Sequence, residues 1–99
     1  MNKGQKEIDK WYKKSKWPYW KPEWILARLV EEVGEFARMV NHEFGPKKKK
    51  ATENKQELED EFGDILYTLA CFGNSNGIDM DTALKKSIHK AHNRDKNRF

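Results

Sequence analysis

The chain has 99 residues, of which 36% are hydrophobic, 36% charged and 12% aromatic, and its formal net charge is +4. This length allows one domain over residues 1–99 with one modest core, and the aromatic content excludes simple disorder. A lone cysteine, Cys71, excludes an intramolecular disulfide and a cysteine-based zinc site. No apolar run reaches the ~18–20 residues of a membrane span, and no apolar segment marks a secretion signal. We therefore expect a cytoplasmic protein.

The first predicted element is a short, lysine-rich helix over residues 3–16. Pro18 and Pro22 interrupt the helical pattern, because proline disfavours the α conformation in the residue before it. Pro22 can begin the next helix, which is predicted over residues 23–44. Apolar residues recur there at steps of three and four, as one helical stripe: Leu26, Leu29, Val30, Val33, Ala37, Val40 and Phe44.

A glycine and a proline at positions 45 and 46 are expected to end this helix. A charged loop follows, including the Lys47–Lys50 run, and is expected to extend to Asn54. The third helix is predicted over residues 55–76. Its apolar stripe consists of Leu58, Phe62, Ile65, Leu66, Leu69 and Phe72.

The fourth helix is predicted over residues 80–97, with Asp79 as its N-cap. The alternation of polar and apolar residues that is typical of strands is missing from the sequence. The fold class is therefore all-α, a four-helix bundle. Because the apolar stripes are wide for so short a chain, we expect homo-oligomerisation to complete the bundle, as a homodimer or homotetramer.

Acidic and basic residues are unevenly distributed. Residues 1–24 carry seven basic and three acidic residues (net +4), residues 25–84 carry seven and twelve (−5), and residues 85–99 carry six and one (+5). One interpretation is a solvated surface with basic ends. The other is a carboxylate cluster that binds cations, with phosphate-binding groups nearby.

An acid–apolar–glycine–acid phrase occurs on both central helices, from Glu32 to Glu35 and from Glu61 to Asp64. Acids three residues apart lie about 60° apart around a helix, so each pair shares a face beside the apolar stripe. Packing the two stripes together would bring the four carboxylates to one rim. Hard divalent cations such as Mg²⁺ or Mn²⁺ take oxygen ligands. The alternative is a pair of exposed, solubilising faces.

The two phrases also share a glycine, Gly34 in the first and Gly63 in the second. Inside a helix, glycine costs about 1 kcal/mol relative to alanine. Its repetition at the same place predicts the close approach of another backbone or of a ligand.

The predicted fourth helix carries a basic row, Lys86, Lys90 and Arg94, with Asn93 beside it. Such a row can bind a polyphosphate, with lysine as a point charge and arginine as a fork. A solubilising basic face is the plainer alternative. Trp20 could stack on a base, and packing in the core or at an interface is the alternative for this side chain.

Four segments resemble the MazG-like all-α nucleotide pyrophosphohydrolases, in particular their compact, single-domain YpjD-like type. They are LVEEVGEFA (29–37), EFGDIL (61–66), NSNGID (74–79) and KAHNR (90–94). The resemblance covers residues from about 19 to the end of the chain. The basic helix within residues 1–18 lies outside it, and its role is unassigned.

The resemblance implies Mg²⁺-dependent hydrolysis of a nucleoside triphosphate to the monophosphate and pyrophosphate, with Mn²⁺ as a substitute ion. It implies that Lys90, Asn93 and Arg94 lie near the substrate phosphates. Either Glu31 or Glu35 would orient or deprotonate the attacking water. The metal ligands implied are Glu32, Glu35, Glu61 and Asp64.

Two other classes of function stay open. One is a catalytically silent helical bundle that binds nucleotides or serves as a partner scaffold. The other is a basic nucleic-acid-binding protein, suggested by the lysine- and tryptophan-rich start. The acidic middle of the chain disfavours nucleic acid as a partner, because it prevents a single basic face.

Overall fold

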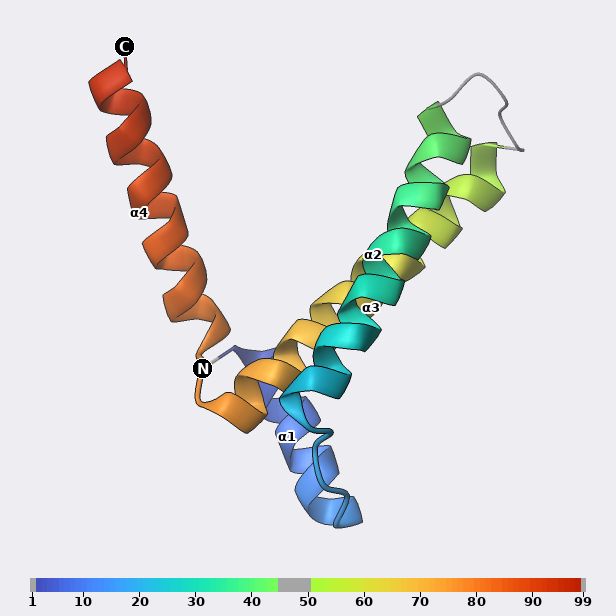
Figure 1. Cartoon of the computed structure of the whole chain (residues 1–99), viewed down its shortest axis with the longest axis vertical. Coiled ribbons are helices and arrows are strands. Elements are labelled where there is room, and N and C mark those ends of the chain that lie inside the picture. Colours follow the sequence, from blue (N-terminus) through green and yellow to red (C-terminus); the bar gives the residue numbers. More distant parts are fainter. Residues whose placement is uncertain (1, 45–50, 99) are drawn as a thin grey trace. The chain divides into compact units, whose positions relative to one another are not determined.

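The computed structural model describes residues 2–44 and 51–98, and the side chains of residues 2–44 and 56–94. These residues form four α-helices and no strand (Figure 1). The all-α fold class is confirmed. The helices are α1 (Lys3–Ser15), α2 (Pro22–Phe44), α3 (Ala51–Asn76) and α4 (Met80–Arg98).

The helix bounds follow the sequence prediction closely, with one difference. Helix α3 begins at Ala51, so the segment up to Asn54, expected in the charged loop, is helical. The expected helix stop at positions 45 and 46 and the Lys47–Lys50 run lie outside the described residues. None of the described helices has the length and apolar character needed to span a bilayer.

The chain divides into two compact units. The hairpin unit comprises residues 20–69, that is α2 and most of α3. The junction unit comprises residues 1–19 and 70–99, that is α1, the last turns of α3, and α4.

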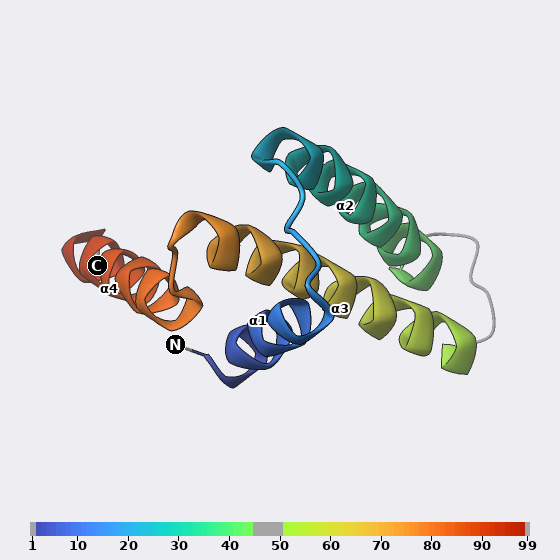
Figure 2. The same ribbon diagram turned by 90° about the horizontal axis from the view of Figure 1, so that it is seen from below.

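In the hairpin unit, α2 and the first part of α3 run antiparallel and side by side (Figures 1 and 2). The residues of α2 that are buried lie seven apart, at Ile25, Glu32 and Met39. They repeat on one face of the helix. The rings of Phe36 and Phe62 add a contact between the helices, with their centroids 6.2 Å apart.

The expectation that the apolar stripes form the buried face between α2 and α3 is wrong for the single chain. Val30 is 64% exposed and Phe62 55% exposed. Glu32 lies within the buried face, and not beside it as expected, because α2 turns the line of Ile25 and Met39 toward α3. Among the described residues of this unit, several large apolar side chains are exposed: Leu26, Val30, Val33, Phe44, Phe62, Leu66 and Leu69.

In the junction unit, local capping sets the helix ends. The side chain of Asn2 caps α1 by accepting from the backbone N–H of Gly4 at 2.7 Å. Helix α3 ends at Asn76, and the φ of +69° at the next residue, Gly77, favours glycine. Asp79 directly precedes α4 and accepts from the backbone N–H of Thr82 at 2.9 Å. The predicted N-cap is confirmed.

Two further side chains of this unit are partly or fully buried. Cys71 is buried, and burial raises the pKa of its thiol, as fits a small core residue. Tyr19 stacks on Tyr12, with ring centroids 4.3 Å apart, and its hydroxyl donates to Asp9 at 2.9 Å. The pKa of Tyr19 is raised to about 12, first by burial and then by this bond to a carboxylate.

Candidate active site

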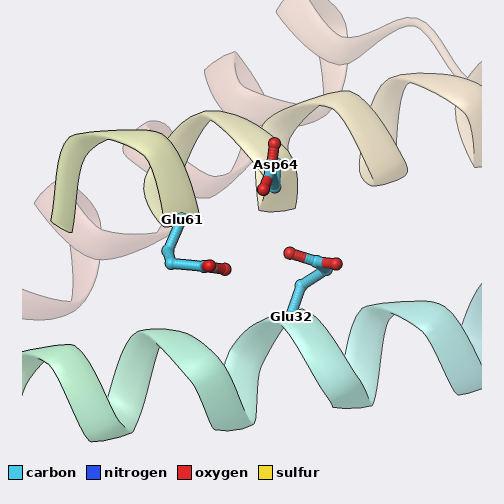
Figure 3. A group of neighbouring side chains, drawn as sticks. All are labelled: Glu32, Glu61 and Asp64. Carbon is cyan, nitrogen blue, oxygen red and sulfur yellow. The ribbon is translucent and has the colours of Figure 1, made fainter. Parts of the chain in front are cut away.

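Three carboxylates meet between the helices of the hairpin unit (Figure 3). Glu32 comes from α2, whereas Glu61 and Asp64 come from α3, and one oxygen of each lies within 4.8 Å of the others. The spacing of three residues on α3 puts its two acids on one face. The antiparallel partner helix then supplies the third carboxylate.

Glu32 is the most buried of the three, with 7% of its surface exposed. Its Oε1 lies 3.0 Å from Nε of Arg28, one helical turn earlier on α2. A buried carboxylate needs such a partner, because desolvation disfavours its charged form. Arg28 is not among the site residues predicted from the sequence, although the i,i+4 spacing of an arginine and a glutamate indicates such a pair.

Glu61 is the carboxyl group of the cluster whose pKa is raised. Burial is the largest cause that raises the pKa of Glu61 above its ordinary value of 4.5, and hydrogen bonding to Glu32 adds to it. The negative charges of Glu32, Asp64 and Glu35 raise this pKa further. The Oε2 atom of Glu61 is buried without a hydrogen-bond partner among the described residues. An oxygen in this condition, among like charges, is suited to a cation.

Glu35, the fourth predicted ligand, lies at the rim of the cluster. Its Oε2 accepts a bond of 2.7 Å from Nη2 of Arg38, and the three-carboxylate group does not include it. It shares with Glu31 the lining of a hollow of about 560 Å³, which is completed by Arg28, Val30, Glu32, Gly34, Glu61 and Asp64. The structure thus brings three of the four predicted ligands together and leaves the fourth within the same hollow.

A second, smaller hollow of about 300 Å³ adjoins the first on the same two helices. It contains Glu57, whose Oε2 is buried without a hydrogen-bond partner among the described residues. The remaining lining consists of Glu35, Arg38, Met39, His42, Asp60 and Glu61.

The two glycines of the repeated phrase face open space. A Cβ added at Gly34 or Gly63 would meet no heavy atom within 4 Å in the described part of the chain. The expected close approach of a backbone is therefore not made within the single chain. Gly34 lines the larger hollow, where the missing side chain leaves room beside the carboxylates.

The predicted phosphate-binding residues lie on α4. Lys86, Lys90, Asn93 and Arg94 are all exposed, and Nδ2 of Asn93 is 2.9 Å from Nε2 of His89. These residues belong to the junction unit and the carboxylates to the hairpin unit. Their role toward phosphate stays a prediction.

All four tryptophans are more than half exposed, at Trp11, Trp17, Trp20 and Trp24. The ring of Trp20 meets that of Trp24 edge to face at 6.4 Å, and Nζ of Lys21 lies 5.7 Å from the Trp24 ring centroid. Trp20 therefore keeps a large exposed surface on which a base could stack.

Fold and site together define an all-α protein with a candidate divalent-metal centre. Residues 21–99 match the MazG nucleotide pyrophosphohydrolase domain. The chain belongs to this family, and the resemblance seen in the sequence is confirmed. Helix α1 lies outside the matched residues.

Similar proteins are found in Bacillus subtilis (strain 168). YpjD is 44% identical over 95 residues, which cover 96% of this chain and 86% of YpjD. YvdC is 32% identical over 92 residues, which cover 87% of each protein. The crystal structure of YpjD, described as a candidate pyrophosphatase, superposes with a TM-score of 0.73 at 42% identity, over 87% of this chain and 85% of that one.

Proposed function

We propose that this chain is a Mg²⁺-dependent nucleoside triphosphate pyrophosphohydrolase. It would hydrolyse a ribo- or deoxyribonucleoside triphosphate at the bond between the α and β phosphates, to the monophosphate and pyrophosphate. The observation that carries this proposal is the cluster of Glu32, Glu61 and Asp64, with three carboxylate oxygens within 4.8 Å. Membership of the nucleotide pyrophosphohydrolase family supports the reaction class.

The donor set of this cluster fits a hard divalent cation. Mg²⁺ in proteins is held by a few carboxylates together with waters and substrate phosphates, and Mn²⁺ accepts the same ligands. Glu32, Glu61 and Asp64 would hold the ion, and Glu35 would add a fourth carboxylate from the rim. When bound, the cation spreads the charge of the reacting phosphate and lowers the pKa of an attacking water.

The exposed carboxylates at the rim would act on the water that attacks the phosphate. Glu31 and Glu35 both line the hollow of about 560 Å³, and either could orient the water or accept its proton. Nη2 of Arg38 donates to Oε2 of Glu35 at 2.7 Å. This contact supports a role for Glu35 in orienting a ligand.

The basic row of α4 would bind the polyphosphate. Lys86, Lys90 and Arg94 repeat every four residues along the helix, so they form one line of positive charge. Asn93 adds an amide donor beside them. The exposed ring of Trp20 would stack on the base.

We further propose that the chain works as a homodimer or homotetramer in the cytoplasm, in nucleotide-pool housecleaning. A large exposed apolar patch on a protein surface is typical of an interaction site. The hairpin unit exposes such side chains on both helices, among them Leu26, Val30, Leu66 and Leu69. A second copy would cover them.

The test is pyrophosphate release from a panel of standard ribonucleoside, deoxyribonucleoside and oxidised nucleoside triphosphates, with Mg²⁺ and with a chelator. We expect release that requires the metal. Nucleotide binding without release would support the silent bundle instead. DNA or RNA binding that falls steeply with salt, again without release, would support a nucleic-acid-binding protein.

A further inference from the structure

Helix α1 lies outside the family match, yet it contains the most buried polar side chain of the described residues. Gln5 has 0% of its surface exposed. It lies against the turn that connects α3 to α4, within the junction unit. The donors and acceptors of a fully buried amide are as a rule hydrogen-bonded. The partners of Gln5 therefore show which elements it connects.

The amide of Gln5 joins both sides of this turn. Its Nε2 donates to the backbone carbonyl of Ile78 at 2.9 Å, and its Oε1 accepts from the backbone N–H of Met80 at 2.8 Å. Asn74, in the last turn of α3, donates to the backbone carbonyl of Gln5 at 3.0 Å. One residue of α1 therefore contacts the end of α3, the turn, and the start of α4.

The contact to Met80 acts on the first residue of α4. The first N–H groups of a helix have no partner within the helix, and Gln5 supplies one. Asn2 adds a second contact from the start of the chain to the first turn of α4, because its Nδ2 lies 3.3 Å from Oδ1 of Asp81.

Gly73 makes the contact possible. A Cβ at this position would lie 2.8 Å from Nε2 of Gln5 and 2.7 Å from the carbonyl oxygen of Ile78. A side chain at position 73 would therefore displace the amide or the turn. The glycine and the glutamine form one arrangement, although they are far apart in sequence.

We propose that Gln5 is a positioning residue that sets the direction of α4 and thereby the place of its basic row. This inference rests on the proposed function, in which the row binds the triphosphate. The helix rises 1.5 Å per residue, so Lys90 lies about 15 Å from Met80 along the axis and Arg94 about 21 Å. A swing of about 10° at the turn would displace Arg94 by about 4 Å, far more than a bound phosphate tolerates.

The test compares Gln5→Leu with Gln56→Leu, which makes the same change at an exposed position of α3. For Gln5→Leu we expect faster amide hydrogen exchange over residues 80–84 and a KM for the triphosphate raised about tenfold. The value of kcat should stay within about twofold, because groups that bind phosphate equally in ground and transition states change KM alone. Mn²⁺ affinity without nucleotide should be unchanged, and Gln56→Leu should match the wild type throughout.

A double variant sharpens the test. Lys90→Ala should raise the KM for the triphosphate less in the Gln5→Leu background than in the wild type, because a displaced lysine already contributes little to phosphate binding. If Gln5→Leu does not fold, Gln5→Glu takes its place, since it keeps the acceptor for Met80 and loses the donor to Ile78.

Several outcomes would overturn the inference. These are an unchanged KM, unchanged exchange over residues 80–84, or a joint loss of kcat and Mn²⁺ affinity, which would indicate general destabilisation. A wild-type chain without turnover on any triphosphate contradicts the proposed function as well. Wild-type turnover with an unaltered KM in Gln5→Leu contradicts the positioning role alone.

Discussion

The junction unit and the hairpin unit each bury polar groups, and they do so in opposite ways. In the junction unit, the amide of Gln5 is fully buried, and it both donates and accepts at distances of 2.8 and 2.9 Å. In the hairpin unit, Glu32, Glu61 and Asp64 place like charges within 4.8 Å. A matched amide stabilises the fold, whereas crowded carboxylates disfavour it until a cation neutralises them.

This contrast separates a structural contact from a candidate active site. Burial alone does not distinguish them, because Glu32 and Gln5 are both buried. The state of the hydrogen bonds does, since an oxygen of Glu61 is buried without a partner among the described residues. Substitutions of the clustered carboxylates should therefore change metal binding and turnover, whereas substitution of Gln5 should leave metal binding unchanged.

The largest effect is expected from Asp64→Asn. Turnover should fall about 10²- to 10³-fold, the scale on which loss of one charge-stabilising group acts. The metal-free chain should remain folded, and gain stability, because one of the repelling charges is removed. Pyrophosphate release and thermal unfolding measure the two properties, and Glu59→Gln, at an exposed position of α3, is the control.

Glu35→Gln tests the fourth carboxylate in the same assay. We expect it to lose most turnover and to stay folded as well, because Glu35 lines the hollow without belonging to the three-carboxylate cluster. Full activity of either variant would remove that residue from the mechanism.

Addition of Mg²⁺ should give the next largest effect. An ion that binds only the folded chain, at 100 times its Kd, stabilises it by about 2.7 kcal/mol. We expect a higher melting temperature with Mg²⁺ than with a chelator. Glu61→Gln should lose most of this shift and Glu59→Gln should keep it; equal shifts in both would place the ion elsewhere.

Alanine at two glycines of α3 should give opposite signs. Gly73→Ala should lower the free energy of unfolding by about 1–3 kcal/mol, because its Cβ would lie 2.7 Å from the backbone oxygen of Ile78. Gly63→Ala should raise it by up to about 1 kcal/mol, since nothing described lies within 4 Å of the added Cβ. Urea unfolding of the two variants measures both, and a loss at Gly63 would indicate that a second copy contacts this position.

The smallest effect is the pH dependence of stability without metal. The unfolded chain releases the Glu61 proton near the ordinary pKa of 4.5, whereas the folded chain keeps it to higher pH. Rising pH therefore lowers the free energy of unfolding across this window. In Glu61→Gln, the free energy of unfolding should fall less as the pH rises. Urea unfolding between about pH 4 and pH 8 measures this difference.

Asp79 in the junction unit should contribute to the pH dependence of stability with the opposite sign, so that its contribution rises with pH. Hydrogen bonds from the side chain and then the backbone of Thr82 lower the pKa of Asp79 to about 2. Its contribution is present above the ordinary value of 3.8 and is lost as the pH falls toward 2. Asp79→Asn should flatten the acid limb of the stability curve, and an unchanged limb would contradict the assignment.

The sequence predicts the helices well because their ends depend on local groups. Pro22 and Asp79 stand at helix starts in the structure as expected. The repeated phrase likewise locates the carboxylate cluster, since spacing on a helix determines which acids share a face.

What the sequence does not predict depends on contacts between distant elements. The apolar stripe of α2 is wide, so periodicity alone does not show that Ile25, Glu32 and Met39 face α3. The role of Gln5 has no local signal, because the partners of its side-chain amide lie 69 to 75 residues away.

The exposed indoles give the chain an optical reporter of its own. All four lie between Trp11 and Trp24, and none of them lines the hollow that contains the carboxylates. Fluorescence quenching that a nucleotide causes, and that Mg²⁺ alone does not, would thus follow base stacking separately from ion binding, without any label.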